Sequence, residues 1–210
     1  MIIPIDALKK YFFTNNISIK GVLHIGSHDC EELLFYTKEL LLDSNKIVWI
    51  DALEEKIINA REKGIPNVFN EVITDKDNDI VMFNKSNNSG SSSILSFKLH
   101  TVMYPEIVIS EIQKIRTITI DSFFEKNHID CKAINLWNLV IQGAELLALK
   151  GGAKSIEYVD VIITKIFVEE LYSGCNLVHI SDDFLTQHGF KRVLTELTPY
   201  GWGEAVYVKK

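Results

Sequence analysis

Three short segments of the chain place groups capable of chemistry directly after an apolar run. The first is HIGSHDCEE at 24–32, in which Gly26 permits a tight turn and a close approach of a ligand to the backbone. Ser27 and His28 follow, and the start of a helix after them would offer unpaired N–H groups to a carboxylate or a ribose. One glycine is a weak signal, and a plain strand-to-helix turn would explain it about equally well.

The second segment ends in Asp51, which directly follows the apolar run KIVWI at 46–50. An acid that ends the second strand of such a sheet can accept hydrogen bonds from both hydroxyls of an adenosine ribose. Together, Gly26 and Asp51 favour an adenosine-containing cofactor. They do not distinguish a nicotinamide dinucleotide from S-adenosylmethionine.

The third segment is QGAE at 142–145, after a further apolar run. The amide of Gln142 can both donate and accept hydrogen bonds, and Gly143 allows the backbone to turn. Glu145 falls in the first turn of the next helix, where a negative charge is favoured. Glu145 could therefore face a ligand, or it could only stabilise the start of its helix.

An alternation of apolar strands with amphipathic helices must position these segments. We expect strands over 21–25, 46–50, 68–73, 133–141, 159–167, 191–196 and 205–209, and helices over 5–15, 30–42, 53–63, 94–102, 121–127, 144–150 and 180–188. Residues 79–83 should pair with or extend the strand at 68–73, 113–120 should be extended, and Asp121 should cap the helix after it. The alternation predicts an α/β fold with a mostly parallel sheet, right-handed crossovers and a closing antiparallel hairpin.

Composition is typical of one globular domain: 210 residues, 47% hydrophobic and 24% charged, with a net charge of −6. We expect a single domain over 1–210, with a helical extension at 1–20 and a substrate-side insertion at 86–112. Lysines are scattered among acids, so no basic patch recommends a nucleic-acid partner. Apolar runs fall far short of the roughly 20 residues that cross a bilayer, and the N-terminus lacks a secretory signal. We therefore expect no membrane association and a cytoplasmic location.

Two further features of the composition bear on the site. The cysteines Cys30, Cys131 and Cys175 are isolated, which favours neither a disulfide framework nor a zinc site. The segment NNSGSSS at 87–93 consists of turn-forming residues with little to pack. We expect it to be mobile without ligands and to order over the acceptor.

Six blocks of sequence resemble the FkbM-type methyltransferases in order and spacing. They lie at 21–32, 48–52, 142–153, 169–175, 184–190 and 201–209, and the QGAE block and the GWG ending are the specific ones. The resemblance implies a Rossmann-like methyltransferase fold with a seven-stranded sheet whose last strand is antiparallel. It also implies transfer of a methyl group from S-adenosylmethionine to a hydroxyl oxygen, commonly of a sugar or a polyketide-like product.

The resemblance also assigns residues. It places the cofactor against Gly26, Ser27, His28, Asp51, Ala52, Glu71 and Val72. The serine-rich stretch at 89–93 and the segment after it, with Lys98, His100 and Pro105, resemble the part of the family that faces the substrate.

Two positions depart from the family pattern. Val140 stands where the family usually has Asp, and Lys165 stands where it usually has Glu. If those acids hold a metal or act as the base, this chain must use another group. His100 is then the candidate base, and Lys165 is one only if burial keeps it neutral. We expect His100, Gln142, Glu145 and Lys165 at the catalytic centre, and no divalent metal.

The sequence leaves alternatives open. The favoured interpretation is an O-methyltransferase that acts on a hydroxyl of a sugar or glycan. The alternative is a catalytically degenerate domain that keeps the adenosine pocket, or only the fold, and serves as a binding or assembly module. A nicotinamide oxidoreductase is disfavoured because the second and third glycines of its fingerprint are absent. The acceptor and a homo-oligomeric state stay undetermined.

Overall fold

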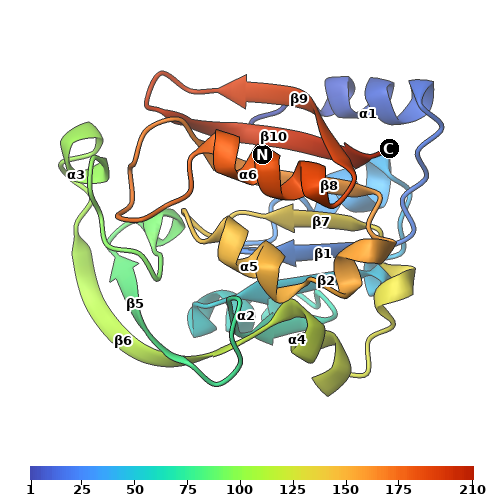
Figure 1. Cartoon of the computed structure of the whole chain (residues 1–210). Coiled ribbons are helices and arrows are strands. Elements are labelled where there is room, and N and C mark those ends of the chain that lie inside the picture. The colour runs from blue at the N-terminus through green and yellow to red at the C-terminus, as the bar shows by residue number, and fades with distance from the viewer.

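A seven-stranded sheet forms the centre of the molecule, and the computed structural model describes all of residues 1–210 (Figure 1). The strands are β1 (Val22–Ile25), β2 (Ile47–Asp51), β3 (Val68–Asn70), β7 (Leu136–Leu139), β8 (Val161–Phe167), β9 (Phe190–Leu197) and β10 (Trp202–Lys209). Their order is β3-β2-β1-β7-β8-β10-β9. The first five of these pair in parallel, whereas β10 runs antiparallel to both β8 and β9. The predicted fold class is confirmed.

Successive residues of each central strand enter different cores, because side chains alternate between the two faces of a sheet. In β1, Val22 joins one cluster and Leu23 joins the other. Helices α4 (Ile120–Lys126), α5 (Glu145–Gly151) and α6 (Val178–Gln187) supply residues to the Leu23 side. Helices α1 (Ile5–Thr14), α2 (Glu54–Glu62) and the π-helical turn η1 (Phe35–Glu39) supply residues to the Val22 side. Both faces are covered, which explains why the strands are apolar throughout.

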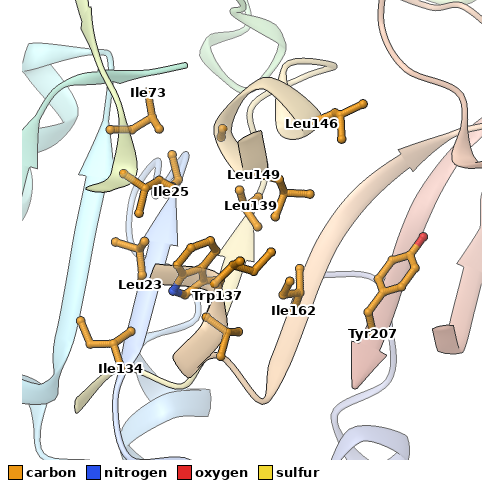
Figure 2. Packing of buried hydrophobic residues seen from close by; sticks show 14 of the residues in the cluster. Leu23, Ile25, Ile73, Ile134, Trp137, Leu139, Leu146, Leu149, Ile162 and Tyr207 are labelled. Atoms are coloured by element: carbon orange, nitrogen blue, oxygen red, sulfur yellow. The ribbon is translucent and has the colours of Figure 1, made fainter. Parts of the chain in front are cut away.

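The Leu23 side holds the larger core. Figure 2 shows Trp137 and Leu139 of β7 beside Leu149 of α5, with Leu23 and Ile25 of β1 next to them. Trp137 and Leu149 are at most 1% exposed. Packing of α5 against β7 fixes the turn that joins them, which is the QGAE segment.

A second, three-stranded sheet projects from the end of the main sheet toward which the parallel strands point (Figure 1). It comprises β4 (Val72–Ile73), β6 (Ile109–Ile118) and β5 (Ile80–Ser86), in that order. The short helix α3 (His100–Met103) lies beyond its far end. The remaining 3₁₀ turns are η2 (Ser44–Lys46), η3 (Ser89–Ser91), η4 (Cys131–Ala133) and η5 (Ser155–Tyr158).

Several expected elements differ in the structure. The helix expected over 30–42 is reduced to η1, since Cys30 and Leu41 have φ angles of 57° and 56°, outside the right-handed helical region. The strand expected over 68–73 splits between the two sheets as β3 and β4. Residues 80–86 pair with β6, not with β3.

Two helix predictions also need correction. Only His100–Met103 is α-helical within the expected 94–102, because Phe97 instead forms a bridge with Tyr172. The N-cap of α4 is Thr119, whose hydroxyl accepts the Ser122 amide at 3.1 Å. The Asp121 carboxylate instead accepts the backbone amides that open the η5 turn.

None of the helices has the length and apolar character that crossing a membrane would require.

Replacement of Leu149 by alanine should lower the free energy of unfolding by about 2–5 kcal/mol, because the side chain is fully buried beside Trp137. The neighbouring Lys150 is exposed, so Lys150→Ala should change stability by no more than about 0.5 kcal/mol. Urea unfolding of both variants measures the difference. Equal stability of the two would show that α5 does not depend on this contact.

Candidate active site

Two adjoining cavities lie where β1, β2 and β7 end. The first has a volume of about 310 Å³ and is lined by imidazole and carboxylate groups, among them His24, His28, Glu31, Glu32 and Asp51. The second has a volume of about 340 Å³ and is lined by His100, Tyr104, Lys165, Tyr172, Trp202 and Glu204. Gly90, Val140 and Gln142 line both, so the cavities share a wall.

A narrow apolar cleft extends from the first cavity. Its walls include Ile50, Val72, Phe83 and Ile141, and it shares Gly26, Asp51 and Ala52 with the first cavity. Glu71 lies at its edge, where its carboxylate pairs with Lys126 at 2.6 Å. Ala52, Glu71 and Val72, which the resemblance assigned to the cofactor, therefore fall together at this cleft.

Gly26 makes the closest backbone approach in the site. Its φ is 83°, and a Cβ at this position would lie 2.1 Å from the Val140 carbonyl oxygen. The amides of Gly26 and Ser27 both donate to the Ile50 carbonyl, at 2.8 and 3.0 Å. These two amides are thus already paired within the protein. Ser27 is 1% exposed and does not line either cavity.

Asp51 holds the loop that follows β1. Its Oδ2 accepts the His28 amide at 2.7 Å, and its Oδ1 accepts the Leu53 amide at 2.9 Å. Burial raises the pKa of the Asp51 carboxyl, although the two amides act in the opposite direction. Each carboxylate oxygen keeps a further lone pair, so the group can still accept a hydroxyl from the first cavity.

His28 connects this loop to the serine-rich segment. Its Nε2 lies 2.8 Å from the Ser89 hydroxyl, and its Nδ1 lies 2.8 Å from Glu31 and 3.1 Å from Asp29. Metal-ligand atoms of His28, Asp29 and Glu31 all lie within 4.8 Å of one another. The Lys56 ammonium, 2.7 Å from Asp29, already supplies a cation to this group.

The serine-rich segment is packed, contrary to the expectation that it has little to pack. Ser91, Ser92 and Ser93 are all buried. Ser93 exchanges backbone hydrogen bonds with Asn84, and its hydroxyl donates to the Gln142 carbonyl at 2.9 Å. The segment is thus part of the wall between the cavities rather than a loose cover.

A buried polar cluster centred on His24 borders the first cavity. His24 is 1% exposed, stacks on Trp49 with ring centroids 5.1 Å apart, and has its Nδ1 3.1 Å from the Tyr36 hydroxyl. Asn138 donates to the same hydroxyl at 2.8 Å. Burial lowers the pKa of His24 to about 4, so the imidazole is neutral at pH 7.

Glu32 is a second residue that the sequence analysis did not single out. It lines the first cavity, and its Oε1 lies 2.9 Å from the amino group of Met1. The Met1 amino group therefore forms an ion pair with the Glu32 carboxylate. The only signal in the sequence was the acidic pair after the first turn.

Gln142 connects the two cavities. Its Oε1 accepts hydrogen bonds from the Lys165 ammonium at 2.6 Å and from the Tyr172 hydroxyl at 3.2 Å. Lys165 lies with its Nζ 4.0 Å from the centroid of the Trp202 ring. Burial lowers the pKa of Lys165 to about 8, while Glu145 and Glu204 act to raise it.

Glu145 faces its own turn. Its two oxygens accept the amides of Ile141 and Gly143, both at 2.9 Å, and it does not line either cavity. Burial raises its pKa to about 7. We therefore assign Glu145 a positioning role for the Gln142 turn, in place of the catalytic role that the sequence suggested.

His100 lines the second cavity and is 3% exposed. Its ring stacks on Phe97 at 4.1 Å. Its Nε2 makes one long contact of 3.3 Å with the Ser91 hydroxyl, and its Nδ1 has no hydrogen-bond partner. Burial lowers the pKa of His100, and the nearby Lys165 lowers it further. The ring is therefore neutral at pH 7 and makes no strong hydrogen bond.

The model of the methyltransferase FkbM domain matches residues 24–192, which is most of the chain. The chain belongs to this family. No curated protein sequence matches it. S-adenosylmethionine is the cofactor of the family.

One solved structure supports the fold, and two others are less similar. Magnesium protoporphyrin IX methyltransferase from Synechocystis PCC 6803, solved with the cofactor bound, has a TM-score of 0.50 at 9% identity, covering 98% of this chain and 78% of that one. A SAM-dependent methyltransferase from Aquifex aeolicus has a TM-score of 0.47 at 13% identity, covering 98% and 97%. A putative RNA methyltransferase from Pyrococcus horikoshii has 0.42 at 12% identity, covering 98% and 81%. At such identities the likeness concerns the fold alone.

The chemistry of the first cavity fits S-adenosylmethionine. Carboxylates suited to an amino group and to ribose hydroxyls are present in Glu32 and Asp51, and the adjoining cleft is apolar, as an adenine ring requires. Gly26 leaves room where a Cβ would press on the β7 turn.

The neutral state of His24 should make the fold sensitive to acid. The unfolded chain binds a proton at this residue below pH 6.5, whereas the folded chain does so only near pH 4. Stability from this group is therefore lost as the pH falls between these values, by up to about 3 kcal/mol. Urea unfolding at pH 7 and pH 4.5 should show a smaller loss in His24→Gln than in the parent. His179 is exposed, and His179→Gln should behave like the parent. An unchanged loss in His24→Gln would contradict the assignment.

Proposed function

We propose that this protein transfers a methyl group from S-adenosylmethionine to a hydroxyl oxygen of a sugar or glycan. The observation that carries the proposal is the wall shared by the two cavities at Val140 and Gln142, with the neutral imidazole of His100 in the second cavity. A donor in one cavity and an acceptor in the other would meet at this wall.

The first cavity supplies the groups that bind the donor. When bound, S-adenosylmethionine supplies a methyl group on a positively charged sulfur. Asp51 would accept the ribose hydroxyls, and the second carboxylate oxygen of Glu32, Oε2, would accept the amino group because Oε1 is paired with Met1. Ala52, Glu71 and Val72 would border the adenine in the apolar cleft. His28 and Ser89 hold the rim of the cavity in place through their 2.8 Å contact.

The second cavity supplies the base. An acceptor hydroxyl loses its proton when its oxygen is methylated, and a base within hydrogen-bond reach speeds that step. His100 is neutral at pH 7 and makes no strong hydrogen bond, so it can take this proton. Gln142, held by Lys165, Tyr172 and Ser93, keeps the shared wall fixed between the two sites.

Two features support a small hydroxylated acceptor. The insertion at 86–112 contributes Ser91, His100 and Tyr104, so the second cavity is closed by side chains rich in hydroxyl and aromatic groups. The net charge of −6 disfavours a nucleic-acid acceptor.

A degenerate domain that only binds the cofactor or a partner is the second candidate. It is favoured by one observation: an apolar side chain, Val140, and a cation, Lys165, stand at the ends of the central strands beside the site. Measured turnover distinguishes the two candidates.

Asp51→Ala should weaken cofactor binding by about 1.5–3 kcal/mol, because hydrogen bonds to a charged group contribute about that much. Calorimetric titration with S-adenosylhomocysteine measures the effect. Asp51→Asn keeps one acceptor oxygen and should lose less. Glu54 is exposed in the next helix turn, so Glu54→Ala is the matched control. An unchanged dissociation constant in a folded Asp51→Ala protein would remove Asp51 from the site.

His100→Ala should lower turnover by roughly 10²-fold or more and leave cofactor affinity nearly unchanged, since it removes only the base. Turnover should persist in excess chelator, because Val140 and Lys165 offer no oxygen ligands for a hard cation. Loss of activity on chelation would contradict the metal-free mechanism. His28, Asp29 and Glu31 would then be the residues to test as metal ligands. Full activity of the His100 variant would exclude it as the base. No activity across a broad panel of sugars would favour the degenerate domain.

A further inference from the structure

The ammonium of Lys165 is half-buried in the second cavity and has no carboxylate within ion-pair distance. Its contacts are the Gln142 Oε1 at 2.6 Å and the face of Trp202 at 4.0 Å. Other lysines without an acidic partner, such as Lys150 and Lys154, are exposed to water, whereas Lys165 is half-buried in the cavity wall. Partial burial of a cation costs free energy unless an anion or another hydrogen-bond acceptor replaces the lost water.

The two carboxylates with the strongest electrostatic effect on Lys165 already accept hydrogen bonds from backbone amides. Glu145 is held by the amides of Ile141 and Gly143. Glu204 stands opposite Lys165 in the β8–β10 ladder, but its Oε2 accepts the amides of Ile2 and Ile3 at 2.6 and 3.1 Å. Neither acid forms an ion pair with Lys165.

The ammonium keeps capacity for a further partner. A lysine has three N–H donors, and only one of them is used, on Gln142. Gln142 and Trp202 fix the position of the charge, which leaves the remaining donors for a group in the cavity. Hydrogen bonds between charged groups are stronger than those between neutral groups, so an anion in the cavity would bind Lys165 more tightly than a neutral group would.

We propose that the second cavity takes hydroxylated acceptors that carry an anionic group, such as the carboxylate of a uronic acid, and that Lys165 binds this group. The inference rests on the proposed function and names the class of its acceptor. Binding of the anion at Lys165 would fix the orientation of the acceptor, with its hydroxyl facing the His100 side of the same cavity. Lys165 is in this account a specificity-determining residue and not the base.

Calorimetric titration of the protein saturated with S-adenosylhomocysteine tests the inference without requiring turnover. The probes are methyl β-glucuronide and methyl β-glucoside, which differ in the carboxylate, and glucose 6-phosphate. The parent should bind the glucuronide at least about tenfold more tightly than the glucoside. Lys165→Met should abolish that ratio, and Lys165→Arg should retain part of it. Lys154 is exposed and makes no side-chain contact with an acid, so Lys154→Met should keep the full ratio.

The outcomes separate the inference from the function. A preference for glucose 6-phosphate that Lys165→Met abolishes would support the anion site and identify phosphate as the anion. Equal affinity for glucuronide and glucoside, no binding of either anionic probe, or an unchanged ratio in folded Lys165→Met would overturn the inference. If the glucoside is then methylated, the proposed function still stands. Lys165-dependent binding without any transfer would instead leave the inference intact and contradict the function.

Discussion

The contact between two strand ends organises the site. Gly26 after β1 and Val140 after β7 approach so closely that any side chain at position 26 would collide with the β7 backbone. The Ile50 carbonyl of β2 holds the same turn through two amides, and Asp51, the next residue, holds the amide of His28. Three neighbouring strands thus end in one hydrogen-bonded unit. The first cavity depends on this unit, because Gly26, Asp51 and Val140 all line it.

Charge in the site is controlled mainly by burial. His24, which lines the first cavity, and His100, which lines the second, are kept neutral because the fold buries them. Burial also lowers the pKa of Lys165 to about 8 and raises the pKa of Glu145 to about 7. An isolated buried charge is unfavourable, so Glu145 is bound by two amides, whereas Lys165 has only a carbonyl oxygen and an aromatic ring. This asymmetry is the basis for placing an anionic acceptor on Lys165.

Much of the fold could be predicted from the sequence because the central strands are apolar on both faces and alternate with amphipathic helices. The ends of β1 and β2 were also predictable, so Gly26 and Asp51 could be placed at the edge of the sheet. Long-range pairing was not: the split of 68–73 between two sheets depends on β6, some 40 residues later. The hydrogen-bond partners of Glu145 could not be predicted, because these amides of its own turn depend on the backbone geometry there. The sequence analysis did not single out His24 and Glu32 as site residues. Both line the first cavity, and the sequence alone does not show which side chains point into a cavity.

The central claim is that a neutral imidazole, His100, takes the acceptor proton, and the pH dependence of kcat/KM for the acceptor tests it most directly. The pKa of His100 is lowered from 6.5, and the imidazole must be unprotonated to act as a base. For an uncharged acceptor we therefore expect a rate that rises with pH, has its midpoint below 6.5 and stays level through pH 8. A midpoint near 8, where Lys165 loses its proton, would contradict the claim and assign the base to Lys165.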